Sequence, residues 1–141
     1  MPGRVDEKSV LHSVDYLPTL ARLADATIDP KDAKGLVGED ISDVWLGKER
    51  PRTTDLFWKV NGDQKPTALR RGDWKLYVPG TKKSKGPSVE LFDLAKDPSE
   101  TTNLANRHPE LVRQLTAVVE QWKAALPKKY LGSEKEKDKD K

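Results

Sequence analysis

The stretch Ala68-Leu-Arg-Arg-Gly-Asp-Trp-Lys-Leu76 decides how the centre of this chain folds. Apolar and long side chains typical of strands flank Gly72 and Asp73, a pair of residues that favours tight turns. The pattern therefore predicts either an antiparallel hairpin or one continuing strand with a bulge at the glycine. In the hairpin interpretation the two strands cover residues 67–71 and 73–78.

Working outward, two further runs have the character of strands, over residues 55–60 and 89–94. A helix is predicted over residues 108–125, where Pro109 suits the first helical position and Pro127 ends the pattern. No strand–helix–strand alternation recurs, which predicts an α+β fold: a small antiparallel sheet of about four strands with a packed C-terminal helix. The apolar stripe of that helix comprises Leu111, Val112, Leu115, Val118, Val119 and Trp122.

A second helix is predicted near the start of the chain, over residues 13–26, with Ser13 or Asp15 as its N-cap. Leu17, Leu20 and Leu23 recur on one face, and that apolar face must pack against something. Between residues 27 and 52 the sequence is rich in glycine, proline and aspartate, which predicts a loop with one short helical turn at residues 41–46.

Length and charge exclude several classes of protein. A chain of 141 residues is too short for a large two-layer enzyme. Its 26 Lys and Arg and 23 Asp and Glu alternate, so we expect no nucleic-acid partner, and Lys82, Lys83 and Lys85 are interpreted as a solvated loop. No apolar run approaches the roughly 20 residues of a membrane span, so no membrane partner is expected either.

The remaining features leave the compartment open. The first ten residues lack the apolar run of a signal peptide, and the absence of cysteine excludes disulfides and thiolate chemistry. Residues 128–141 end in alternating acids and lysines, which predicts a disordered charged tail.

Residues that carry out chemistry are scarce. His12 and His108 lie far apart and form no metal-binding pair. A capping or solvent-facing role is favoured for His108, and a structural role at the end of a buried strand is favoured over cleft lining for His12. Asp97 precedes Pro98, as a turn-starting aspartate does. We therefore predict no catalytic residue and no metal ligand. Apolar periodicity predicts core positions for Trp45, Trp58, Trp74 and Trp122. The expected exception is Trp58, because a polar loop that could overhang a binding cleft follows it.

Four stretches carry a further pattern: His12-Ser-Val-Asp-Tyr-Leu-Pro-Thr-Leu20, Leu56-Phe-Trp58, Ala68-Leu-Arg-Arg-Gly-Asp-Trp-Lys-Leu76 and Glu90-Leu-Phe-Asp-Leu-Ala-Lys-Asp-Pro-Ser-Glu-Thr-Thr-Asn-Leu104. In this order they resemble the C-terminal region of sulfatases of the arylsulfatase type, in the alkaline phosphatase superfamily. The resemblance runs over residues 2–126, and it implies that residues 1–50 are the end of an α/β catalytic domain, including its last helix, plus a connecting loop. Residues 51–127 would be the small C-terminal subdomain, and residues 128–141 have no counterpart.

Such enzymes are sulfuric ester hydrolases that use calcium and a formylglycine made from a Cys/Ser-x-Pro-x-Arg motif. This chain has no cysteine, and none of its serines is followed two residues later by proline. No catalytic residue is therefore carried over, and Ca2+ and formylglycine are expected only in the complete enzyme. The resemblance implies a sulfated ester or sulfated carbohydrate as substrate and the missing catalytic part as a partner. Complete relatives are often periplasmic or secreted.

In such enzymes the C-terminal subdomain lies at the mouth of the substrate cleft, which makes Trp58, Lys59, Arg70 and Lys75 candidates for the cleft rim. Two structural alternatives stay open: Lys75 facing solvent, and Arg70 paired with a carboxylate across the sheet. The leading hypothesis is a C-terminal sulfatase fragment that is inactive alone, from a truncated gene, a mis-called start or a split enzyme. The alternative is a stand-alone module derived from this subdomain that binds a sulfated sugar or a catalytic partner.

Overall fold

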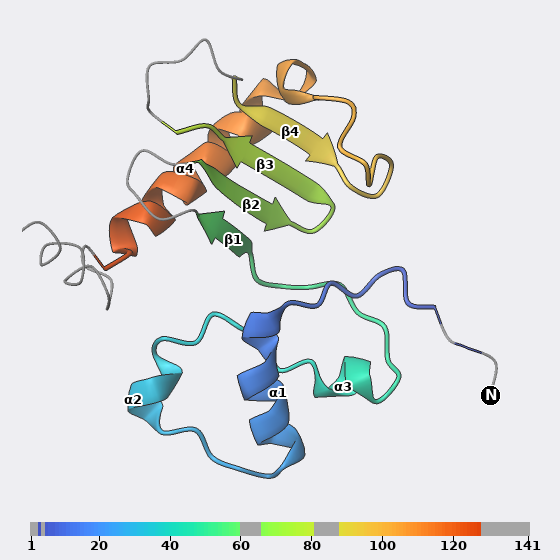
Figure 1. Cartoon of the computed structure of the whole chain (residues 1–141), viewed down its shortest axis with the longest axis vertical. Helices are drawn as coiled ribbons and strands as arrows, with labels where there is room; N and C mark the ends of the chain where they lie inside the picture. Colours follow the sequence, from blue (N-terminus) through green and yellow to red (C-terminus); the bar gives the residue numbers. More distant parts are fainter. Residues whose placement is uncertain (1–2, 4, 60–65, 81–87, 128–141) are drawn as a thin grey trace, which may run out of the picture.

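A computed structural model describes residues 3, 5–59, 66–80 and 88–127 (Figure 1). Three predictions fall outside these ranges: the loop after the first strand, the basic cluster Lys82, Lys83 and Lys85, and the charged tail. No helix among the described residues has the length and apolar character needed to cross a membrane. The elements are the 3-10 turn Ser13–Asp15, α1 Tyr16–Leu23, α2 Pro30–Ala33, α3 Ser42–Trp45, β1 Leu56–Lys59, β2 Thr67–Arg71, β3 Trp74–Val78, β4 Glu90–Asp93, the 3-10 turn Ala105–Arg107 and α4 Pro109–Ala125.

The four strands form one antiparallel sheet in the order β1-β2-β3-β4, so the predicted α+β fold is confirmed. The structure also decides between the two predictions for Gly72 and Asp73, a hairpin turn or a bulge in one continuing strand. Arg71 of β2 pairs directly with Trp74 of β3, so the two residues between them form a tight hairpin and not a bulge. Gly72 has a φ of +57°, a backbone conformation that glycine adopts at little cost.

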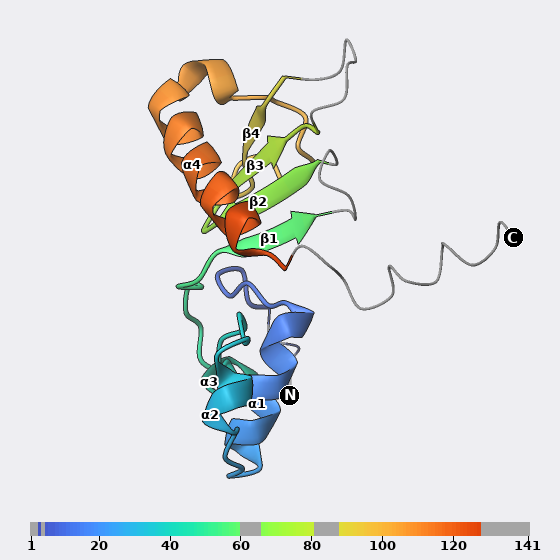
Figure 2. The same cartoon turned by 90° about the vertical axis from the view of Figure 1, so that its left-hand side faces the viewer.

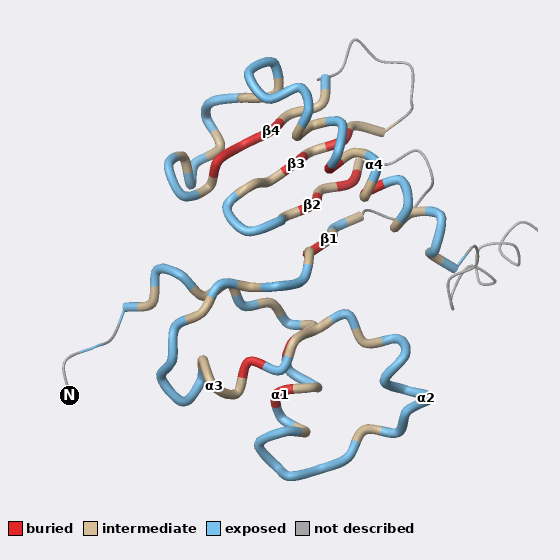
Figure 3. The backbone as a smooth tube through the Cα atoms, turned by 180° about the vertical axis from the view of Figure 1, so that it is seen from behind, coloured by how far each residue is buried: buried red, intermediate tan, exposed pale blue. Residues whose placement is uncertain are grey.

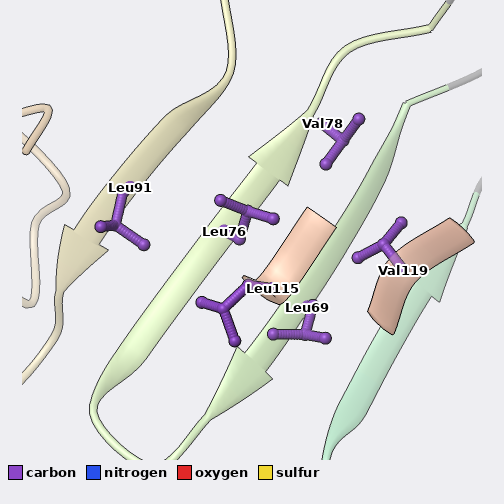
Figure 4. Packing of buried hydrophobic residues seen from close by; sticks show 6 residues of the cluster. All are labelled: Leu69, Leu76, Val78, Leu91, Leu115 and Val119. Atoms are coloured by element: carbon purple, nitrogen blue, oxygen red, sulfur yellow. The ribbon is translucent and has the colours of Figure 1, made fainter. Parts of the chain in front are cut away.

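Helix α4 covers one face of this sheet (Figures 1 and 2). Leu69, Leu76 and Leu91 project from three adjacent strands toward Leu115 and Val119 of the helix, and none of the five side chains has any solvent exposure (Figure 4). Each such leucine contributes about 2 kcal/mol of hydrophobic stabilisation relative to an exposed position. This cluster is the main core of the chain.

The opposite face of the sheet, here called the outer face, carries the side chains that alternate with this core. Arg70 and Lys75 are directly paired in the β2–β3 register, and they alternate with Leu69 and Leu76 of the core. Trp58 likewise alternates with Phe57, which stacks on Trp122 of α4 with ring centroids 4.6 Å apart. No helix covers the outer face among the described residues (Figure 2).

The residues before β1 form a helical part beyond the β1 edge of the sheet (Figure 1). Its buried positions are few, as Figure 3 shows, and they are mostly polar. Thr19 of α1 is fully buried, and its hydroxyl accepts a hydrogen bond from the Ile41 N–H at 3.0 Å. The loop that leads to α3 is thereby held against α1.

Of the two residues predicted as the N-cap of the first helix, Asp15 occupies the N-cap position of α1, although its side chain makes no capping hydrogen bond to that helix. The chain enters α1 through the 3-10 turn Ser13–Asp15, which begins at the predicted first residue of the helix and is capped by His12. Its Nδ1 accepts from the Val14 N–H at 3.3 Å, while the Asp15 carboxylate accepts from the His12 N–H at 2.8 Å. The two residues form a reciprocal capping box.

Candidate functional site

A cavity of about 530 Å³ opens on the outer face of the sheet. It brings together Trp58 from β1, Arg70 from β2 and Lys75 from β3, three of the four residues predicted from the sequence. Ala68 and the segment after β4 complete the lining, through Leu94, Pro98 and Glu100. We call this cavity the outer-face pocket.

Lys75 is held inside this pocket by an ion pair. Its Nζ lies 2.6 and 2.7 Å from the two carboxylate oxygens of Glu100, 25 residues further along the chain. The lysine side chain is 28% exposed, so it lies on the open face of the sheet, paired with Glu100 and not free in solvent. Glu100 has a φ of +56°, a left-handed conformation that costs a non-glycine residue free energy and that the surrounding turn imposes.

Arg70 has no carboxylate partner among the described residues. Its Nε donates to the Gly72 carbonyl oxygen at 3.0 Å, within its own hairpin. The cross-sheet ion pair proposed for Arg70 is instead made by its neighbour Arg71, whose Nε lies 2.8 Å from Asp55 Oδ1. Because Glu100 offsets the charge of Lys75, Arg70 supplies the net positive charge of the pocket lining.

Trp58 forms an exposed aromatic wall of the pocket. It is 40% exposed, in agreement with its prediction as the exception among the tryptophans. His12 packs edge-on against it, with ring centroids 5.4 Å apart and an interplanar angle of 68°. Trp45, predicted as a core residue, is 42% exposed and contacts the ring of Tyr16, so that prediction is wrong.

Lys59 does not line the outer-face pocket. It is paired with Thr67 in a row of the sheet that alternates with Trp58, at the end of the edge strand β1. Together with Trp58, Ala68 and Tyr77 it lines a separate hollow. The structure therefore places Lys59 next to Trp58 but outside the pocket that Trp58, Arg70 and Lys75 line.

Glu100 is the pocket residue that sequence reasoning missed. The hairpin pattern predicts that Arg70 and Lys75 are opposite each other, because a two-residue turn fixes that register. Nothing in local spacing brings Glu100 to Lys75. The contact depends on how the turn started by Asp97 folds back, where the Asp97 carboxylate accepts from Thr102 N–H at 2.8 Å and Thr101 Oγ1 at 3.1 Å.

A buried ion-pair network fixes the segment that leads into β1. Arg52 donates two hydrogen bonds to the carboxylate of Asp15, at 2.6 and 2.9 Å. Burial raises the pKa of Asp15, but the hydrogen bonds from Arg52 and from the backbone of Glu39 and His12 outweigh it and hold the pKa below its usual value. The helical part and the edge strand are thereby joined.

Glu39 anchors the same segment. Its carboxylate accepts hydrogen bonds from Arg50 Nη1 at 2.9 Å and from the Thr53 and Thr54 N–H groups at 2.8 and 2.5 Å. Burial raises the pKa of Glu39, yet these donors together lower it to about 2. The carboxylate is fully ionised at neutral pH and has a structural role.

The described residues contain no group of three or more histidines, aspartates or glutamates arranged to hold a metal ion. His108 precedes α4 and packs edge-on against Trp74 at 5.1 Å, without a capping hydrogen bond from its side chain. The described side chains therefore do not fit a calcium ion, and we derive no catalytic step through one.

No family model matches the chain, but individual proteins do. An uncharacterized sulfatase of Schizosaccharomyces pombe is 32% identical over 120 residues, which are 77% of this chain and 20% of that protein. An N-acetylgalactosamine-6-O-sulfatase of Bacteroides thetaiotaomicron is 28% identical over 128 residues, 81% of this chain and 24% of that protein. Arylsulfatase K of Mus musculus is 28% identical over 113 residues, 76% of this chain and 20% of that protein.

Solved structures share the fold. The 6S-sulf protein of Bacteroides thetaiotaomicron, from work on glycosaminoglycan metabolism, superposes with a TM-score of 0.59 at 25% identity and covers 78% of this chain and 24% of that one. Ps i-CgsB, in complex with k-i-k-neocarrahexaose, gives a TM-score of 0.62 at 23% identity over 77% of this chain and 23% of its own.

Over about 77% of its length, the chain is thus similar in sequence to sulfatases, and it shares its fold with a region of the solved structures. The chain spans about a fifth to a quarter of the length of the curated relatives that it matches. This similarity supports the resemblance to a sulfatase C-terminal region that the four sequence stretches predicted.

Proposed function

We propose that this chain serves as the C-terminal part of a sulfuric ester hydrolase of the arylsulfatase type, and that it contributes the rim of the substrate cleft. The observation that carries the proposal is similarity to named sulfatases over most of the chain. Catalysis would come from the part of the enzyme that holds formylglycine and calcium, because this sequence lacks the Cys/Ser-x-Pro-x-Arg motif. The substrate class would be sulfated carbohydrates or other sulfate esters.

Helix α1 supplies the surface on which the catalytic part would dock. Its apolar side chains are about half exposed, with Tyr16, Leu17 and Leu20 between 53% and 55% exposed. The buried side of the helix is the polar one, with Asp15 and Thr19. An amphipathic helix normally buries its apolar face, and an exposed apolar patch of this kind marks an interaction surface.

The division of the chain follows from this proposal. Residues 1–50 would complete the α/β catalytic domain, and residues 51–127 would form the C-terminal subdomain that carries the outer-face pocket. Trp58, Arg70 and Lys75 would line the substrate cleft, with Lys59 at its outer end. The buried pair of Asp15 and Arg52 would set the position of one unit against the other.

The test joins this chain to sulfatase sequence that carries the catalytic motif and compares the wild type with Leu20→Glu. In the joined protein we expect Leu20→Glu to lower aryl sulfate turnover and thermal stability, because it places a charge in an apolar interface. In the isolated chain the same change should alter the free energy of unfolding by less than about 0.5 kcal/mol. Lys31→Glu on α2, outside this face, is the charge control. Equal behaviour of the two variants in the joined protein would contradict docking through α1.

A further inference from the structure

The outer-face pocket has a distinctive balance of charge. Its lining holds one carboxylate and two cations, and the carboxylate of Glu100 is engaged by both oxygens with Lys75. Arg70 makes a single hydrogen bond through Nε to the backbone. Its two terminal nitrogens donate no hydrogen bond to any described residue, and a guanidinium in this state is suited to a bidentate contact with an oxyanion.

The apolar lining adds a second requirement. Trp58 presents an aromatic surface beside Ala68, Leu94 and Pro98, which bear no charge. A cavity of about 530 Å³ falls within the range of small-molecule sites, which combine apolar walls with a few placed polar groups. A ligand that satisfies the pocket therefore needs an apolar face to lie on the indole and one negative group to reach Arg70.

We propose that the outer-face pocket binds a single sugar ring that carries one anionic substituent, with Trp58 under the ring and Arg70 on the anion. Lys75 and Glu100 act as a neutral pair: they contact ring hydroxyls and hold the shape of the pocket, and Lys75 is not the anion-binding cation. This inference deepens the proposed function, on which it rests for the choice of a sulfate ester as first probe. A carboxylate of a uronic acid offers the same chemistry.

The experiment titrates the whole chain, alone, with three probes by two-dimensional NMR and calorimetry. The probes are N-acetylgalactosamine 6-sulfate, unsulfated N-acetylgalactosamine and glucuronic acid. We expect the sulfated sugar to bind at least tenfold more tightly than the neutral one and to shift the Trp58 indole resonance. Tighter binding of glucuronic acid than of the sulfated sugar would assign the site to uronic acids. Equal affinity for the neutral and anionic sugars, or no shift at millimolar concentrations, would overturn the proposal.

Variants assign the roles. Arg70→Gln should abolish the tenfold preference for the anionic sugar while leaving the weak affinity for the neutral sugar. Trp58→Ala should weaken both sugars, and Trp58→Phe should restore part of the affinity. The double variant Lys75→Gln with Glu100→Gln should weaken both sugars by a similar factor, so the anionic preference survives. If that double variant loses the preference and Arg70→Gln keeps it, the assignment of the anion to Arg70 is wrong.

Arg113→Gln, on the exposed surface of α4, is the matched control and should bind like the wild type. Thermal unfolding of each variant verifies that it is folded. Failure of this proposal is distinct from failure of the proposed function, since sugar binding is measured without catalysis. A chain that binds sugars but gives no turnover when joined to the catalytic motif refutes only the proposed function. Turnover without sugar binding by the isolated chain refutes only the pocket.

Discussion

Asp15 and Arg52, 37 residues apart, form a bidentate ion pair that is almost completely buried, with side chains 0% and 3% exposed. Arg52 also donates through Nε to the Thr54 carbonyl at 3.1 Å, directly before β1. Asp15 stands at the start of α1 and also accepts from the Glu39 N–H at 2.9 Å. One pair of side chains thus ties the helical part to the edge of the sheet.

Replacing Asp15 by asparagine should lower the free energy of unfolding by about 3 kcal/mol, because it removes the bidentate counter-charge of the buried Arg52 guanidinium and leaves only Glu39, whose Oε1 lies 4.0 Å from Arg52 Nε. Urea denaturation of the two proteins measures this. Glu110→Gln, which removes an exposed pair with Arg113, should cost less than about 1 kcal/mol. Similar losses in the two variants would show that the Asp15–Arg52 pair does not stabilise the fold.

Acid should destabilise the chain in a window set by Glu39. The pKa of its carboxyl is about 2 in the folded chain, against 4.5 for an unperturbed glutamate. The contribution of the ionised carboxylate to the free energy of unfolding is therefore complete above about pH 4.5 and is lost as the pH falls toward 2. The pKa of Asp15 is lowered in the same direction. In Glu39→Gln, the loss of unfolding free energy between about pH 4.5 and about pH 2 should be smaller by on the order of 3 kcal/mol. Denaturant titrations at several pH values test it, and an unchanged slope in Glu39→Gln would contradict it.

Gly38 should tolerate no side chain. A Cβ at this position would lie 1.9 Å from the Val14 carbonyl oxygen and 2.5 Å from its carbon, both backbone atoms beside α1. Gly38→Ala should therefore cost about 2 kcal/mol or more of unfolding free energy. Gly35→Ala is the control, since the nearest atom to its Cβ would be the Asp32 carbonyl oxygen at 3.9 Å. Equal thermal midpoints for the two variants would mean that the loop does not pack on α1 as described.

The two leucine-rich surfaces should respond differently to truncation. Leu76→Ala removes a fully buried side chain of the core and should cost about 2–5 kcal/mol. Leu20→Ala removes a side chain that is 53% exposed and should change the stability of the isolated chain by less than about 0.5 kcal/mol. Chemical denaturation measures both. A large cost at Leu20 would show that the apolar face of α1 is already packed within this chain.

The sheet was predictable because its signals are local. Gly72 and Asp73 fix the hairpin, and the regular apolar spacing of α4 identifies the side that packs on the sheet. The start of α1 was less predictable, since the chain enters it through a 3-10 turn capped by a histidine. The helix also ends at Leu23, before the predicted residue 26, because Asp25 adopts a φ of +50°.

The site was predictable only in part, for a physical reason. Arg70 and Lys75 face each other because hairpin register is local, and Trp58 joins them through the alternation of β1. Ion pairs between residues far apart in the sequence cannot be predicted in this way. Lys75 pairs with Glu100, and Asp55 pairs with Arg71 and not with Arg70. Sequence spacing could not tell which of two adjacent arginines would keep an uncompensated charge.

Turnover of a chromogenic aryl sulfate, with calcium present, tests the central claim most directly. It should be measured for the purified chain and for the same chain joined to sulfatase sequence that carries a Cys/Ser-x-Pro-x-Arg motif. We predict turnover only in the joined protein, since this chain supplies the cleft rim and no nucleophile. Hydrolysis by the chain alone would contradict the account and direct the search for a nucleophile to its own serines.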